Sequence, residues 1–253
     1  MKPTAIGILV FACTLGGALA GICLNSVLQE HHLSEDSKDT VKVGIGLIAM
    51  MTALVLGLIT ASAKSSFDTI DQEIRHTAAQ VLTLDRVLAR YGPETKEIRE
   101  VLYHLVERRV EMTWPQKSSQ AAEPGVPVVQ DLEAAMSLIR GLSPQNDAQR
   151  WLQSRALGLG ETVQEARWVV FTTSVGTSVP APFLFILLFW LTIIFVSFGL
   201  FAPKNSIVIT VLLFCALSVA GAVFLILEMG SPFEGLMKIS PDALRFALSH
   251  MNQ

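Results

Sequence analysis

Four long apolar stretches constrain the fold of this chain more than any other feature. Each has twenty or more residues with almost no charge, and they lie at residues 5–24, 43–63, 182–202 and 206–227. A helix needs about 20 apolar residues to cross a hydrocarbon core of ~30 Å. Because lipid offers the backbone no hydrogen-bond partners, such stretches cross it as helices. The sequence therefore predicts an all-α membrane protein with four transmembrane helices.

The four predicted spans divide the chain into parts. In chain order these are a first hairpin at 1–63 with spans 5–28 and 43–63, a helical domain at 64–179, a second hairpin at 180–229 with spans 182–202 and 206–228, and an amphipathic tail at 230–253. The first stretch also carries Ala18-Leu19-Ala20, which fits the small-residue pattern of signal-peptide cleavage. Its apolar sequence continues to Leu28, too long for a signal peptide, so we predict a retained span.

The distribution of charge predicts the orientation in the membrane. Four spans place both termini and residues 64–179 on one side, and that side carries 16 of the 19 Lys and Arg residues. Positive charge is enriched in cytoplasmic loops, so we expect both termini and the helical domain in the cytoplasm of a bacterium, with the spans in its inner membrane. The net charge of −3 implies no nucleic-acid partner. The three cysteines all lie in apolar stretches and define neither a disulfide framework nor a metal site.

The junction after the second span decides how the helical domain is connected. The sequence SAKSSFDTIDQEIR at 62–75 turns charged without Pro or Gly, so we predict that the helix continues until Tyr91-Gly92-Pro93. Ser65 or Ser66 could instead cap a new helix, with Asp68 as partner. A continuous helix would transmit motion of the domain to the membrane; a rigid stalk without a signalling role is the alternative. The candidate coupling residues are Phe67, Asp68, Asp71 and Arg75, the last two spaced as a helical ion pair.

Four longer stretches resemble a bacterial membrane protein family that shares a bestrophin-like domain of unknown function. They are TASAKSSFDTIDQEIR at 60–75, LDRVLARYGPE at 84–94, FWLTIIFVSFGLFAPKN at 189–205 and CALSVAGAVFLILEMGSPFEGLMKIS at 215–240. Bestrophins are oligomeric anion channels gated at a pore between protomers, so the resemblance implies a channel. The chain lacks the acidic calcium-binding pattern and the aromatic pore neck of bestrophins. The implication thus comes from the family and the architecture, not from a motif.

Candidate pore residues come from the second span and from the charges beside it. Before Glu228 the spans contain no charged residue or His, which argues against a proton-coupled transporter but allows a passive pore lined by small and hydroxyl residues. The second span is the least bulky, so we expect it to line the pore. The candidate pore or gate residues are Gly44, Thr52, Gly57, Thr60, Lys64 and Glu228. Lys64 and Glu228 end their spans on the same side; they could form an ion pair, extend separately to the interface, or bind an ion.

Small residues and the tail leave two further questions open. Gly17 and Gly21 in the first span, and Ser218 and Ala222 in the fourth, are spaced for close helix packing, within one protomer or between protomers. After the break at 230–233, a last amphipathic helix could lie on the membrane or, as its few basic residues favour, dock on the helical domain.

The sequence offers little to an enzyme or a metal site. Glu73 and His76 have the spacing of a di-iron ligand pair, but the second pair that such a site requires is missing. His31 and His32 lie among acidic residues in a loop that we expect to be solvated. We therefore predict no catalytic residue, cofactor or metal.

The sequence favours one function and leaves one alternative. We expect a homo-oligomeric inner-membrane channel, with a pentamer as one candidate, that conducts inorganic ions, anions above all. The second span would line the pore and the helical domain would form a vestibule or gate, because four helices are too few for a pore within one protomer. The alternative is a non-conducting membrane scaffold or sensor whose helical domain binds a partner. The bilayer is the other partner.

Overall fold

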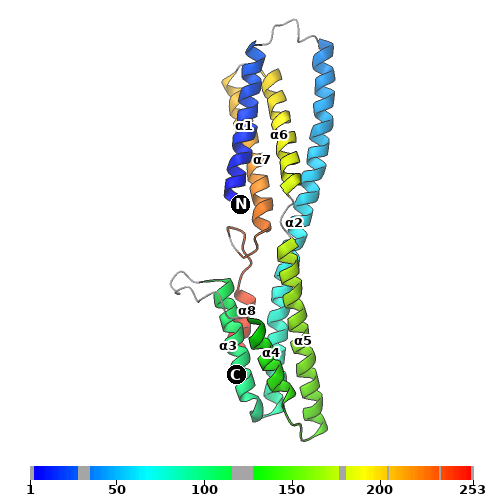
Figure 1. Ribbon diagram of the computed structural model, residues 1–253. Helices are drawn as coiled ribbons and strands as arrows, with labels where there is room; N and C mark the ends of the chain where they lie inside the picture. The colour runs from blue at the N-terminus through cyan, green and yellow to red at the C-terminus, as the bar shows by residue number, and fades with distance from the viewer. Residues whose placement is uncertain are drawn as a thin grey trace. The chain divides into compact units, whose positions relative to one another are not determined.

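A computed structural model describes residues 3–27, 35–115, 128–176, 181–203, 205–233 and 235–251, and all their regular secondary structure is helical. The elements are α1 (Pro3–Val27), α2 (Glu35–Tyr91), a 3₁₀ turn (Pro93–Thr95), α3 (Lys96–Thr113), α4 (Val128–Arg140), α5 (Asp147–Gly176), α6 (Ala181–Phe201), α7 (Ser206–Met229) and α8 (Asp242–His250) (Figure 1). The predicted all-α fold is confirmed. The acidic loop with His31 and His32, and residues 116–127, lie outside the described residues.

Four helices are long and apolar enough to cross a membrane, as the sequence predicts. They are α1, α6, α7 and the apolar part of α2. The chain divides into two compact units. The membrane unit comprises Met1–Phe67 and Thr177–Met237, and the helical unit comprises Asp68–Gly176 and Lys238–Gln253.

In the membrane unit, α1 packs against both α6 and α7 (Figure 1). Two clusters of buried side chains hold these helices together, one around Val10, Leu191 and Val223 and the other around Ala18 and Phe195. Between them, the fully buried Thr14 hydroxyl donates to the carbonyl oxygen of Val10 at 2.8 Å. A hydroxyl in this apolar setting thus has a partner within its own helix, which removes the cost of burying it.

Glycines let α1 and α6 approach more closely than side chains would permit. A Cβ atom at Gly21 would overlap the carbonyl oxygen of Val196, and one at Gly199 would overlap that of Ala18. Small residues at such a crossing bring two backbones together, which is how helices gain contacts in lipid. The small residues of the first span therefore pack within the protomer, which answers one open question. Ser218, in contrast, is exposed on α7.

The second span continues into the helical unit as one helix. α2 runs from Glu35 to Tyr91 without a break at 62–66, so the predicted continuity is confirmed and neither Ser65 nor Ser66 caps a new helix. The helix ends at Gly92, whose φ of 147° lies in the region that favours glycine. Pro93 then begins the 3₁₀ turn that leads to α3.

In the helical unit, α3 packs against α4 and α8, and α4 packs against α5. The second half of α2 contributes buried aliphatic side chains such as Ile70 and Leu84. One face of α3 is buried at Ile98, Leu102, Val106 and Val110. A buried ion pair lies within this core. Asp85 of α2 is fully buried, and Arg99 of α3 donates to its two carboxylate oxygens at 2.8 and 3.0 Å. This hydrogen bonding raises the pKa of Arg99 above its usual value, against the opposing effect of burial.

The C-terminal tail docks on the helical unit. The indole N–H of Trp114 donates to the carbonyl oxygen of Ile239 at 2.7 Å, and Arg86 donates to that of His250, also at 2.7 Å. The apolar face of α8 is buried at Leu244 and Ala247. Because the contacts reach both ends of α8, docking on the helical unit is the arrangement in this structure, as the scarcity of basic residues favours.

Candidate functional site

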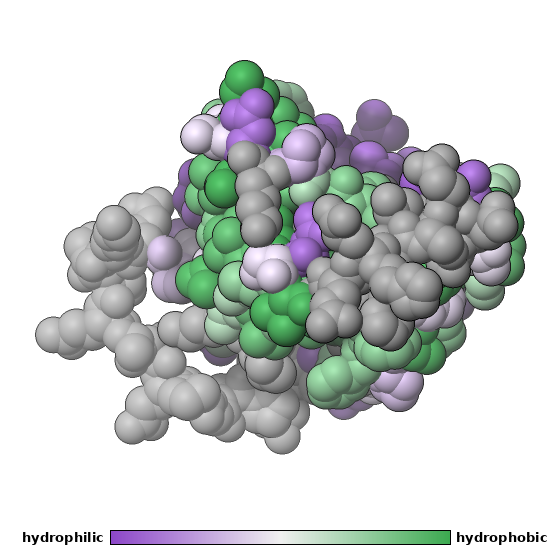
Figure 2. All heavy atoms as spheres, turned by 90° about the horizontal axis from the view of Figure 1, so that it is seen from above, coloured by the Kyte–Doolittle hydropathy of each residue, from purple (hydrophilic) through white to green (hydrophobic). Residues whose placement is uncertain are grey.

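The apolar part of α2 is the span least covered by its own chain. Only 6% of its residues are buried, against 33%, 28% and 22% in α1, α6 and α7. Its large exposed side chains include Leu47, Met50, Leu54 and Leu58. Figure 2, viewed from above, shows green hydrophobic residues beside purple hydrophilic ones on this face. An apolar surface of this extent requires lipid or further protein to cover it.

The predicted pore residues of α2 do not all lie on one face. Gly57, Thr60 and Lys64 are exposed and follow the 3-4 spacing that places residues on one side of a helix. Thr52 is buried, and its hydroxyl donates to the carbonyl oxygen of Ile48 at 2.7 Å. The remaining candidate of this span, Gly44, is exposed. The structure therefore brings Gly57, Thr60 and Lys64 together and turns Thr52 toward the interior of the protomer.

The face of α2 that carries Thr52 is its packed face. Ala63 follows Thr52 by eleven residues, about three helical turns, and is also buried. Ala63 packs with Ile226 and Met229 at the end of α7, where Leu56, Ile59 and Phe67 of α2 join the cluster. Gly57 and Thr60 are exposed beside this packed face and do not belong to the cluster.

Among the candidate coupling residues, Asp71 and Arg75 form the predicted ion pair. The Nε atom of Arg75 donates to Asp71 at 2.8 Å on the exposed side of α2. This hydrogen bond, together with the charge of Asp71, raises the pKa of Arg75; the charge of Asp242 contributes less. The pair lies on the part of α2 that belongs to the helical unit, while Phe67 belongs to the apolar cluster at the end of α7.

Glu228 holds the turn that follows α7. Its carboxylate is buried and accepts the backbone N–H of Leu236 at 2.7 Å. Gly235 has a φ of 84°, and a Cβ atom there would overlap the Glu228 carboxylate. Sequence reasoning treated Glu228 as a pore or gate charge and missed this structural contact. The only local signals of this contact in the sequence were the break at Gly230-Ser231-Pro232 and the glycine at position 235. The ion pair between Glu228 and Lys64 stays a prediction.

Replacing Gly235 with Ala should therefore destabilise this turn. The substitution adds a side chain at positive φ, which costs about 1–2 kcal/mol, and places it against the Glu228 carboxylate. We expect a lower thermal midpoint for the full-length protein in detergent. Gly221→Ala in α7 is the matched control, because a Cβ atom there would meet nothing within 4 Å. Equal midpoints for the Gly235 variant and wild type would contradict the assigned role of Gly235.

The helical unit brings two arginines near each other. Arg109 of α3 and Arg167 of α5 are both half-buried. Burial lowers the pKa of Arg109, and the positive charge of Arg167 lowers it further. Because the residues lie far apart in sequence, on different helices, no local pattern predicted them.

Nothing in the described part of the chain supports a metal site. There, no group of three or more His, Cys, Asp or Glu residues is arranged to hold a metal ion. His76, considered above as one half of a di-iron ligand pair, instead has its Nε2 atom 3.1 Å from the side-chain amide nitrogen of Gln80 on the same helix.

Comparisons with known proteins find one matching family model and several solved structures of similar fold. A family model described as the bestrophin-like domain matches residues 12–244. A crystal structure of a bacterial bestrophin homologue from Klebsiella pneumoniae is 16% identical, with a TM-score of 0.67 over 98% of this chain and 99% of that chain. Two crystal structures of single-substitution variants, described only as membrane proteins, cover the same shares at 14% and 16% identity, with TM-scores of 0.69 and 0.66. No curated protein matches the sequence.

Proposed function

This chain belongs to the bestrophin-like family, and from that membership we propose that it is a homo-oligomeric ion channel of the bacterial inner membrane. The observation that carries the proposal is the uncovered apolar half of α2, of which only 6% is buried. In a ring of protomers, copies of this helix would meet around the symmetry axis and cover one another. A pentamer is one ring that would do so.

The pore would follow the exposed face of α2. Gly57 and Thr60 offer small and hydroxyl surfaces there, and Lys64 adds a positive charge one turn beyond Thr60. Weak, uncharged lining suits a passive path, because ions must enter without being held tightly. Thr52 has no part in this lining, since it is buried in the protomer.

Anions are the proposed cargo, and the helical unit would form a cytoplasmic vestibule or gate. Lys64 on the exposed face, and the Arg109–Arg167 neighbours in the helical unit, supply positive charge. α2 continues from the membrane unit into the helical unit as one helix. A rotation of the part of α2 that lies in the helical unit would therefore be transmitted to the proposed pore face. Asp68, Asp71 and Arg75 lie on that continuing segment.

Ion flux through liposomes that contain the full-length protein tests this function. We expect a chloride gradient to drive more flux than a potassium gradient, and Gly57→Trp to remove most of it by filling the exposed face of α2. Gly16→Trp in α1 is the matched control. Both glycines are exposed and a Cβ atom at either meets nothing within 4 Å, so only the helix differs. Equal flux from both variants would exclude α2 as the pore helix.

A specific observation favours the alternative, a non-conducting scaffold or sensor. Trp168 and Phe171 are exposed on α5, with their rings packed edge to face at 6.2 Å. Exposed aromatic pairs are typical of protein-binding surfaces. Absence of flux under varied calcium, pH and voltage, together with a monomer or a sealed dimer in solution, would favour this function over the channel.

A further inference from the structure

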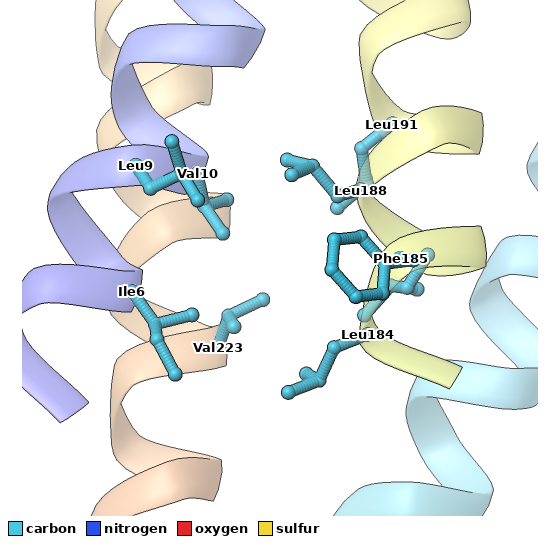
Figure 3. Close-up of a pocket in the computed structure, with 9 residues that line it drawn as sticks. Ile6, Leu9, Val10, Leu184, Phe185, Leu188, Leu191 and Val223 are labelled. Carbon is cyan, nitrogen blue, oxygen red and sulfur yellow. The ribbon is translucent and has the colours of Figure 1, made fainter. Parts of the chain in front are cut away.

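The membrane unit contains a wholly apolar pocket of about 110 Å³ between α1, α6 and α7. Figure 3 shows side chains of α1 and α6 facing each other across it, with a side chain of α7 beside them. The lining residues labelled there include Ile6 and Val10 of α1, Leu184, Phe185 and Leu188 of α6, and Val223 of α7. None of them carries a polar side chain, so the pocket offers nothing to an ion or to a polar ligand.

The pocket extends from the outside of the membrane unit into its core. Val10, Leu191 and Val223, which form its inner end, belong to the buried cluster that holds the three helices together. Leu9 and Phe185, at its mouth, are exposed. A ligand would therefore enter sideways, from whatever surrounds the spans, and its tip would contact the core.

The depth of the pocket places it near one surface of the bilayer. Ile6 lies three residues after the start of α1, Leu184 three after the start of α6, and Val223 six before the end of α7. At about 1.5 Å per residue these positions lie roughly 5–9 Å from the helix ends. The ends in question are on the same side of the membrane, because successive spans alternate in direction. The pocket therefore faces the acyl chains of a single leaflet.

We propose that this pocket binds one acyl chain of a phospholipid from that leaflet. A span in a bilayer is surrounded by hydrocarbon, and an unfilled apolar void loses the dispersion contacts that its lining atoms could make. A cavity of comparable size, about 150 Å³, holds a benzene molecule, so several methylene groups fit. The headgroup remains at the interface, because the pocket has no polar group to receive it.

An acyl chain fits this pocket better than a second copy of the protein. A helix has a diameter of about 10–12 Å with its side chains, too wide for a pocket of about 110 Å³. The described lining comes from α1, α6 and α7, whereas the span left uncovered is α2. The two surfaces are therefore distinct, and the lipid site does not depend on ion conduction.

Spin-labelled phospholipid tests the proposal on the full-length protein. We would reconstitute it in phosphatidylcholine nanodiscs that contain phosphatidylcholine with a nitroxide at mid-chain, and measure the motionally restricted fraction by electron paramagnetic resonance. Leu188→Trp fills the pocket, so we expect it to reduce this fraction relative to wild type. Ile8→Trp is the matched control, because Ile8 is exposed on α1 and does not line the pocket; it should leave the fraction unchanged.

A second variant keeps the test decisive if Leu188→Trp does not fold. Val10→Ala enlarges the buried end of the pocket, so we expect it to raise the restricted fraction. A restricted fraction that is the same in wild type and in every folded pocket variant would overturn the proposal. A second result would also overturn it. If Leu188→Trp changed the oligomeric mass but left the restricted lipid fraction unchanged, a second copy of the protein would be the occupant of the pocket.

Discussion

Arg99→Gln is expected to lower the free energy of unfolding of the helical unit by about 3–5 kcal/mol, the usual cost of removing one partner from a buried ion pair. Asp85 is fully buried, and both of its carboxylate oxygens accept hydrogen bonds from Arg99. The shorter, neutral Gln side chain would leave that carboxylate in the core without its countercharge. Hydrogen exchange of the amides of α2 and α3 in the full-length protein measures the loss.

Two further variants separate this effect from a general loss of charge. Arg150 forms an exposed ion pair with Asp147 on α5, so Arg150→Gln should change stability little. The double variant Asp85→Leu with Arg99→Met removes both charges and should recover most of the stability that Arg99→Gln loses. Similar exchange rates for Arg99→Gln and Arg150→Gln would contradict the role assigned to the buried pair.

Gly199→Leu is expected to separate α1 from α6 and to destabilise the membrane unit by at least about 1–3 kcal/mol, the usual cost of overpacking. A Cβ atom at Gly199 would already overlap the backbone of α1 at Ala18. Backbone atoms cannot move aside as a flexible side chain can, so the helices themselves must part. The thermal midpoint and the monodisperse yield of the full-length protein in detergent measure this effect.

Gly16→Leu provides the control for this second prediction. Gly16 lies on α1 as well, yet a Cβ atom there would meet nothing within 4 Å. The Gly16→Leu variant should therefore fold with nearly the wild-type thermal midpoint. Gly21 lies at the same crossing as Gly199, so Gly21→Leu should lower the midpoint as Gly199→Leu does. If Gly199→Leu and Gly16→Leu behaved alike, the close contact of α1 and α6 would not stabilise the protein.

Much of the secondary structure could be predicted because it depends on neighbours in sequence. The continuity of α2 through residues 62–66 followed from the absence of a breaking residue, and its end at Gly92 from a glycine before a proline. The buried residues of α3 repeat every four positions, which is also a local pattern. The ion pair of Asp71 and Arg75 was likewise predictable, because residues four apart meet on a helix surface.

The candidate site was predicted less well, because it depends on which face of each helix meets another. Thr52 and Thr60 look alike as hydroxyl residues of one span, but Thr52 is buried and Thr60 is exposed. The spacing of Gly17 and Gly21 indicated close packing, but only the position of α6 shows what they pack against. Glu228 had the appearance of a functional charge until the backbone N–H of Leu236 was found on it.

The sequence by itself determined that the chain forms four helices long and apolar enough to cross a membrane, and that one of them continues far beyond its apolar part. The physical reason is local. A backbone in lipid must satisfy its hydrogen bonds within its own helix, and a helix continues until a stop signal such as Gly or Pro ends it. The tertiary structure alone decided that α1 packs on α6, that α8 docks on the helical unit, and that Asp85 meets Arg99. These contacts join residues distant in sequence, and their geometry depends on how whole helices pack, which no local pattern of residues specifies.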